Sequence, residues 1–118
     1  MARRFVTLDV FTATPHAGNP LAVVLDSDGL DTAAMQAITR EFNLSETVFV
    51  QPAAEAGHRA AIRIFTPGRE LPFAGHPTVG TAVLLALQDA VASRGSDVIV
   101  IEEQVGAVTC AVGVSGPK

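Results

Sequence analysis

The sequence contains no tryptophan and no tyrosine, so its six phenylalanines are its only aromatic residues. Proteins that bind nucleic acid usually present a basic patch, often with aromatic rings on which bases stack. This chain instead carries a formal net charge of −4. We therefore expect no nucleic-acid partner.

Cysteine occurs only once, at Cys110, which excludes an internal disulfide and suits a reducing compartment such as the cytoplasm. Long apolar runs are also missing. The longest helical one, Ala82–Leu87, is far shorter than the ~20 residues that span a bilayer. Met1–Phe5 is followed by a strand-like segment and not by the apolar core of a signal peptide. We expect a cytoplasmic protein with no membrane association.

The patterns that hold metals and phosphates are missing as well. His16, His58, His76 and Cys110 show none of the paired spacings that metal ligands adopt. No glycine-rich loop of the dinucleotide- or phosphate-binding type occurs. The residues therefore predict no metal site and no bound nucleotide.

The 118 residues suffice for one domain that buries roughly two-thirds of the surface its unfolded chain would expose. Met35, Ile38 and Phe42 repeat at helical spacing and predict a surface helix, capped by Asp31 and ended by Asn43 in the left-handed conformation. Alternation of polar and apolar residues, or short apolar runs, predicts strands at 5–11, 21–25, 47–51, 60–65, 97–102 and 107–114. Loops are predicted at 14–20, 52–57 and 93–96.

The stretch 69–87 organises the chain. A short extended segment, Glu70–Phe73, is followed by Gly75, and Pro77 suits the first turn of a helix because its missing N–H would have no partner there. Apolar residues cover the whole circumference of this helix, and such a helix is normally buried. We therefore predict an α+β domain in which a mixed β-sheet or barrel wraps around a central α-helix, with one outer helix.

The start of the central helix is a candidate anion site, because helix N-termini present N–H groups and partial positive charge. His76 lies there, where it can donate to a substrate oxygen or relay a proton. A structural histidine bonded to nearby backbone is an equally good interpretation. Thr78 is a candidate for capping the same turn.

Glu46 is a second candidate, because it lies between a helix end and an apolar strand. A carboxylate held against apolar walls can exchange protons near neutral pH and act as a general base. Position alone favours another interpretation, a solvated glutamate that caps the helix or pairs with Arg40, because most glutamates are exposed.

Five motifs occur in order and together span most of the chain. They are Asp9-Val10-Phe11-Thr12, Gly18-Asn19-Pro20-Leu21-Ala22-Val23-Val24, Phe42-Asn43-Leu44-Ser45-Glu46-Thr47, Ile64-Phe65-Thr66-Pro67 and Glu70-Leu71-Pro72-Phe73-Ala74-Gly75-His76-Pro77-Thr78-Val79-Gly80-Thr81-Ala82. In these motifs the chain resembles the phenazine-biosynthesis isomerase family, the PhzF-like proteins, which share the diaminopimelate-epimerase fold.

The resemblance implies catalysis without a metal or an organic cofactor. The family's acid/base glutamate lies in an Asn-Leu-Ser-Glu motif and matches Glu46, which outweighs the solvated interpretation. The family's active-site histidine lies in a Gly-His-Pro-Thr motif and matches His76. A small carboxylate-bearing substrate is then expected to bind at Gly75, His76, Pro77, Thr78 and Asn19.

Members of the family have two such domains with the active site between them, and residues 1–118 resemble the N-terminal domain alone. The resemblance implies the N-terminal domain or subunit of a cofactor-independent isomerase that transfers a proton within its substrate. Two-thiol racemase chemistry is disfavoured, because Ala74-Gly75-His76 contains no cysteine. The alternative function is a non-catalytic ligand-binding or regulatory module of the same fold.

A lone N-terminal domain leaves an apolar surface uncovered, so we expect that the chain is not a monomer. A complementary C-terminal-type chain is the favoured partner. A homodimer is the other arrangement, because closed two-fold pairing is the commonest for a single chain.

Overall fold

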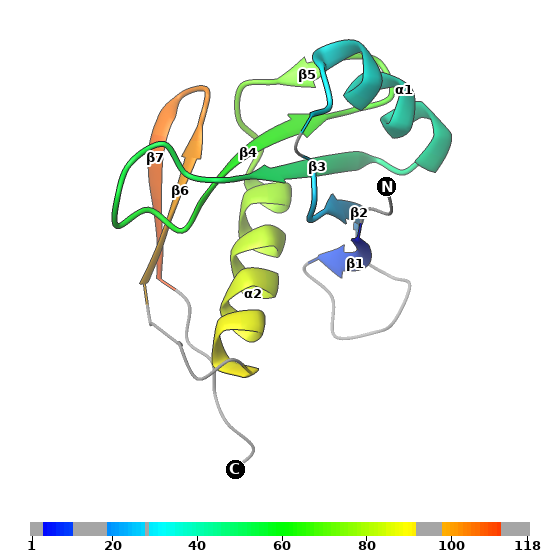
Figure 1. Ribbon diagram of the computed structural model, residues 1–118. Coiled ribbons are helices and arrows are strands. Elements are labelled where there is room, and N and C mark those ends of the chain that lie inside the picture. The colour runs from blue at the N-terminus through cyan, green and yellow to red at the C-terminus, as the bar shows by residue number, and fades with distance from the viewer. Residues whose placement is uncertain (1–3, 11–18, 28, 92–97, 112–118) are drawn as a thin grey trace.

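The computed structural model describes residues 4–10, 19–27, 29–91 and 98–111. Within these ranges the chain forms seven strands and two helices in the predicted order (Figure 1). The strands are β1 (Phe5–Val10), β2 (Asn19–Val24), β3 (Glu46–Gln51), β4 (Ala60–Phe65), β5 (Glu70–Leu71), β6 (Val98–Glu103) and β7 (Gly106–Ala111). The helices are α1 (Thr32–Phe42) and α2 (Gly75–Val91).

The predicted elements are confirmed with small shifts at their ends. β2 begins at Asn19, within the predicted loop, because Asn19 and Pro20 pair with Val10 and Asp9 of β1. Parts of five predictions fall outside the described residues: the strand end at Phe11, the first part of the loop at 14–20, the loop at 93–96, the strand start at Asp97, and the end of the last strand at 112–114.

The strands form one mixed sheet in the order β1-β2-β3-β4-β6-β7, and β5 pairs with β4 beside this path. β2 and β3 are parallel and are joined by α1, as a parallel pair requires a crossover connection. β4 and β6 are also parallel, and the other neighbouring strands are antiparallel. Gly106 begins β7 with a φ of 122°, a backbone region that side chains rarely adopt, which explains a glycine at the tight β6–β7 turn.

The sheet curves around α2, as predicted. In Figure 1, α2 stands between the β6–β7 hairpin on one side and β1–β2 on the other, and β3 and β4 cross near its start. β1, β2, β3 and β6 all contact this helix. The main core lies between α2 and the inner face of the sheet, and its fully buried members include Leu21, Val23, Val48, Ile64, Leu85 and Ile101.

α1 covers the other face of the sheet and forms a second core there. Asp31 Oδ1 accepts a hydrogen bond from the Ala34 N–H at 2.7 Å, and Asn43 ends the helix at a φ of 52°, so both predicted caps are confirmed. Met35 packs against Phe49 and Phe65, whose rings meet edge to face at 5.4 Å. The two helices thus occupy opposite faces, with the sheet between them.

The prediction that α2 is buried all round is wrong for one stripe of the helix. Val79, Val83, Leu87 and Val91 recur every four residues and are 40%, 44%, 48% and 88% exposed; we call them the α2 stripe. The hollow beside its first half is lined by β7, and the hollow beside its second half is lined by Arg4, which precedes β1. β1 and β7 are the two ends of the sheet, so the stripe lies where the sheet remains open.

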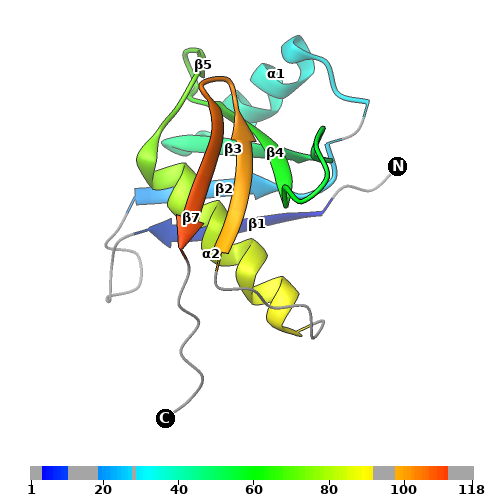
Figure 2. The same ribbon diagram turned by 90° about the vertical axis from the view of Figure 1, so that its left-hand side faces the viewer.

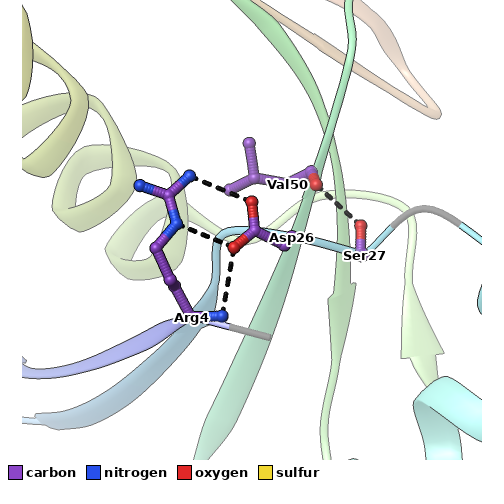
Figure 3. A network of polar contacts seen from close by, with 4 residues as sticks. All are labelled: Arg4, Asp26, Ser27 and Val50. Atoms are coloured by element: carbon purple, nitrogen blue, oxygen red, sulfur yellow. Dashed lines mark hydrogen bonds and ion pairs between the residues drawn. The ribbon is translucent and has the colours of Figure 1, made fainter. Parts of the chain in front are cut away.

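Polar contacts fix the segment that leaves β2 toward α1 (Figure 3). The Asp26 carboxylate accepts hydrogen bonds from Arg4 Nε at 2.7 Å and Arg4 Nη2 at 2.9 Å. The buried Ser27 hydroxyl donates to the Val50 carbonyl at 2.6 Å. These bonds join the segment to both neighbours of β2, the start of β1 and the end of β3.

Candidate functional site

The start of α2 is set by the strand before it. Arg63 of β4 forms a two-pronged ion pair with Glu70 of β5, from Nε to Oε2 at 2.8 Å and from Nη2 to Oε1 at 2.7 Å. The hydrogen bond from Arg63 lowers the pKa of Glu70, so this carboxyl is charged at neutral pH. Only three residues separate β5 from Gly75, and the ion pair therefore fixes where α2 begins.

The first turn of α2 has fewer donors for an anion than a regular helix start. Pro77 has no N–H, and the Thr78 N–H donates to the Ala74 carbonyl at 3.2 Å. The Thr78 hydroxyl also donates to that carbonyl, at 2.8 Å, so Thr78 does not cap the helix by accepting from an N–H. Pro77 and Thr78 are buried, whereas Gly75 and His76 are exposed. An anion at this helix end would therefore meet Gly75 and His76.

The register of the sheet brings the other predicted residues to the same end of the molecule. Glu46, the first residue of β3, is paired with Leu21 of β2, and Asn19 lies two residues before Leu21 on the parallel strand. The next residue of β3, Thr47, is paired with Phe65, the last residue of β4, and Phe65 is paired with Glu70. Because α2 starts just after β5, the starts of β2, β3 and α2 all lie at one end of the sheet (Figure 2).

Glu46 is half-buried at that end. Among the described residues no ion pair joins Glu46 to Arg40, although the sequence left that pairing open. Its neighbour Thr47 is fully buried, so the backbone at Glu46 is held by the core while part of the carboxylate reaches solvent. The side chain of Asn19 lies outside the described part of the chain.

A cavity of about 440 Å³ lies between the first turns of α2 and β7. Two of the predicted substrate-binding residues, Gly75 and Thr78, line it, whereas Glu46 and His76 do not. The remaining lining is mostly apolar: Phe73, Val79, Ala82, Val83, Val108, Thr109, Cys110 and Ala111. Cys110 of β7 is half-buried and contributes to this wall.

Glu103 is a polar residue of this region that sequence reasoning missed. It ends β6, and its Oε2 atom lies 2.9 Å from the Thr78 hydroxyl oxygen, within hydrogen-bond distance. Ile99 and Ile101 of the same strand face the core, so the two-residue alternation of a strand turns Glu103 inward as well. The signal available in the sequence was that Glu103 follows Ile101 by two residues, as Ile101 follows Ile99.

Two further observations concern only the described residues. They contain no group of three or more His, Cys, Asp or Glu side chains placed to hold a metal ion. Neither α1 nor α2 is long and apolar enough to cross a membrane.

Comparisons with known proteins bear on nearly the whole chain. A family model described as phenazine biosynthesis-like protein (PhzC-PhzF) matches residues 8–116. An uncharacterized isomerase from Mesorhizobium japonicum is 59% identical over 93% of this chain and 36% of its own length. A trans-2,3-dihydro-3-hydroxyanthranilate isomerase from Pseudomonas aeruginosa is 45% identical over 92% of this chain and 37% of its own length. The chain thus spans little more than a third of these relatives.

Solved structures show the same relation. A PhzF-family phenazine biosynthesis protein from Enterococcus faecalis is 33% identical with a TM-score of 0.80, over 96% of this chain and 41% of that protein. A hydroxyproline epimerase from Agrobacterium vitis has a TM-score of 0.69 at 11% identity, over 91% of this chain and 36% of that protein, and so shares the fold alone. The architecture is the diaminopimelate-epimerase-like fold, and the chain corresponds to its N-terminal half.

Proposed function

The chain belongs to the phenazine biosynthesis-like protein family, and from this premise we propose that it is the N-terminal domain of an isomerase. The reaction would move a proton within a small metabolite that carries a carboxylate. The observation that carries the proposal is the gathering of Asn19, Glu46 and the first turn of α2 at one end of the sheet. Relatives named trans-2,3-dihydro-3-hydroxyanthranilate isomerase support the substrate class, since an anthranilate bears a carboxylate.

In the proposed reaction Glu46 acts first as a base and then as an acid. Its carboxylate takes a proton from one carbon of the substrate and returns a proton to another, so that the substrate changes in structure but not in composition. The half-buried position of Glu46 supports this role, because a carboxylate that is partly shielded from water still has access to a ligand. One residue serves in both steps, and the proposal requires no metal or organic cofactor.

The substrate carboxylate is proposed to bind at the first turn of α2. The helix dipole and the N–H groups of Gly75 and His76 favour negative charge there, and the His76 ring is exposed for a hydrogen bond to the substrate. Pro77 and Thr78 are buried and would shape the turn from behind. Asn19, at the start of β2, is proposed as a further substrate contact.

The test is Glu46→Gln, assayed in the complete assembly with trans-2,3-dihydro-3-hydroxyanthranilate as the probe substrate. The amide keeps the size of the side chain but cannot accept the proton, so turnover should fall by about 10²–10⁴-fold. Glu41→Gln, at an exposed position of α1, is the matched control and should leave turnover unchanged. Normal turnover by a correctly folded Glu46→Gln protein would remove Glu46 from the mechanism.

A non-catalytic module is the second candidate function. It is favoured by one observation, that the chain matches only 36–37% of the length of the relatives named above. Such a module would bind a carboxylate at α2 without turning it over. Incorporation of solvent deuterium into the probe substrate by the purified chain would exclude this candidate.

The α2 stripe is the surface on which we propose that a partner assembles. Apolar side chains repeat along it for three helical turns, Phe73 continues the exposed apolar surface ahead of the helix, and the sheet is open there. The relatives extend well beyond the matched region, so the proposed partner is a polypeptide equivalent to their remaining part. A partner at this place would also cover the cavity beside β7.

A further inference from the structure

Glu103 lies against the first turn of α2 without a charged partner. Its Oε2 atom is 2.9 Å from the Thr78 hydroxyl. Its Oε1 atom is buried and has no hydrogen-bond partner among the described residues. No described cation forms an ion pair with it. An ionised carboxylate with a buried, unpartnered oxygen is costly, because the lost hydration is not replaced.

The hydrogen atoms available at Thr78 point to the protonation state of Glu103. The Thr78 hydroxyl has one hydrogen but two neighbouring acceptors, the Ala74 carbonyl at 2.8 Å and Glu103 Oε2 at 2.9 Å. The carbonyl can only accept. If Glu103 is ionised, one of the two contacts has no hydrogen. If Glu103 Oε2 carries a proton, it donates to Thr78, Thr78 donates to Ala74, and both contacts are satisfied.

The surroundings of Glu103 agree with the protonated form. Burial raises the pKa of Glu103 above its ordinary value of 4.5, although the contact with Thr78 acts in the opposite direction. From β7 the facing titratable group is the Cys110 thiol, whose own pKa is raised by burial and further by a charge on Glu103. From α2 the contact is Thr78, and the titratable group of the same turn, His76, is exposed. The α2 dipole alone favours the ionised form.

We propose that Glu103 carries a proton in the folded chain and is a positioning residue, which donates to Thr78 and thereby orients the turn of α2 that faces the substrate. The protonation itself depends only on the fold, whereas the positioning role rests on the proposed function. Ionisation of Glu103 would turn the Thr78 hydroxyl hydrogen from Ala74 toward Glu103. It would also place a negative charge behind the proposed anion site. Affinity for an anionic substrate should therefore fall as the pH rises through the pKa of Glu103.

The protonation is tested without substrate by carbon NMR of the chain, with the Glu103 carboxyl signal identified from its loss in Glu103→Gln. At neutral pH the expected signal is that of a protonated carboxyl, in line with the raised pKa of Glu103. The signal of an ionised carboxylate at neutral pH would overturn the proposal. The exposed carboxyl of Glu41 provides the internal reference.

Two variants test whether a neutral, hydrogen-bonding side chain suits position 103. Glu103→Gln keeps a donor toward Thr78, so its thermal midpoint at neutral pH should equal or exceed that of the unaltered chain. Glu103→Ala removes the donor and should lower the midpoint. A Gln variant no more stable than the Ala variant would contradict a donating Glu103.

The positioning role has a separate readout in the complete assembly. Glu103→Gln should make KM for the anionic probe independent of pH over the range in which the unaltered protein weakens, with little change in kcat. If KM keeps its pH dependence while NMR shows a protonated Glu103, the positioning role is overturned and the proposed function stands. Loss of the proposed function would instead appear as undiminished turnover in Glu46→Gln.

Discussion

Glu102 and Glu103 are adjacent in β6, and the strand directs their side chains to opposite faces of the sheet. Glu103 turns inward to α2. Glu102 turns to the loop after β3, where it accepts hydrogen bonds from the Ala54 N–H at 2.8 Å and the Glu55 N–H at 3.0 Å, and contacts His58 Nδ1 at 2.7 Å. These bonds lower the pKa of Glu102, and the bond from the Ala54 N–H has the largest effect. Burial instead raises the pKa of Glu103. The fold thus shifts the pKa values of two identical side chains in opposite directions.

We predict a pH-dependent loss of stability in Glu102→Gln. A carboxyl whose pKa is lower in the folded than in the unfolded chain stabilises the fold above the unfolded value, and this contribution disappears as the pH falls through the folded value. The variant should therefore unfold at a lower temperature than the unaltered chain at neutral pH, and the difference should shrink on acidification. The measurement is the thermal midpoint as a function of pH. A difference that stays constant down to acid pH would argue against this account.

At the scale of the element, α2 offers a matched pair of leucines two positions apart. Leu85 is 1% exposed and lies in the main core, whereas Leu87 is 48% exposed on the α2 stripe. Leu85→Ala should destabilise the isolated chain by about 2–5 kcal/mol, because it leaves a cavity in the core. Leu87→Ala should change the stability by less than about 0.5 kcal/mol. Chemical denaturation of both variants measures the difference, and equal losses would mean that the stripe is covered within the chain.

Elements whose signals are local could be predicted from the sequence. The Asp31 and Asn43 caps of α1 and the alternating strands depend on residues close in the chain, and they formed as expected. The gathering of Asn19, Glu46 and Gly75 was expected only through the family resemblance, because it depends on the register of strands far apart in sequence. The inward turn of Glu103 was missed although its alternation with Ile99 and Ile101 indicated it, whereas the open side of α2 could not be predicted. An apolar helix does not reveal which of its faces the sheet leaves uncovered.

On the scale of the whole molecule, the fold is open between β1 and β7, and the α2 stripe occupies that opening. An exposed apolar surface of this kind is the proposed site of assembly.

We therefore predict that the chain is not a monomer at micromolar concentration. Light scattering should give a mass above that of one chain, or a mass that rises when a partner equivalent to the rest of the relatives is added. Val83→Glu, on the stripe, should reduce that association, because it introduces a charge into an apolar contact. Val105→Glu is the control, since Val105 is 60% exposed but lies at the β6–β7 turn. A stable monomer that no partner alters would remove the interface.

The proposed reacting residues and one wall of the cavity come from different parts of the sequence, and this has an evolutionary consequence. Glu46, His76 and the other proposed contacts all precede Val79, whereas four consecutive residues of the final strand, β7, line the cavity beside α2. β7 is the last strand of the sheet and has a neighbouring strand on one side only among the described elements. Substitutions there can reshape the cavity while the buried strands that hold Glu46 stay intact. Through β7 a lineage can therefore change the shape of this cavity and inherit Glu46, the proposed proton-transfer residue, unchanged.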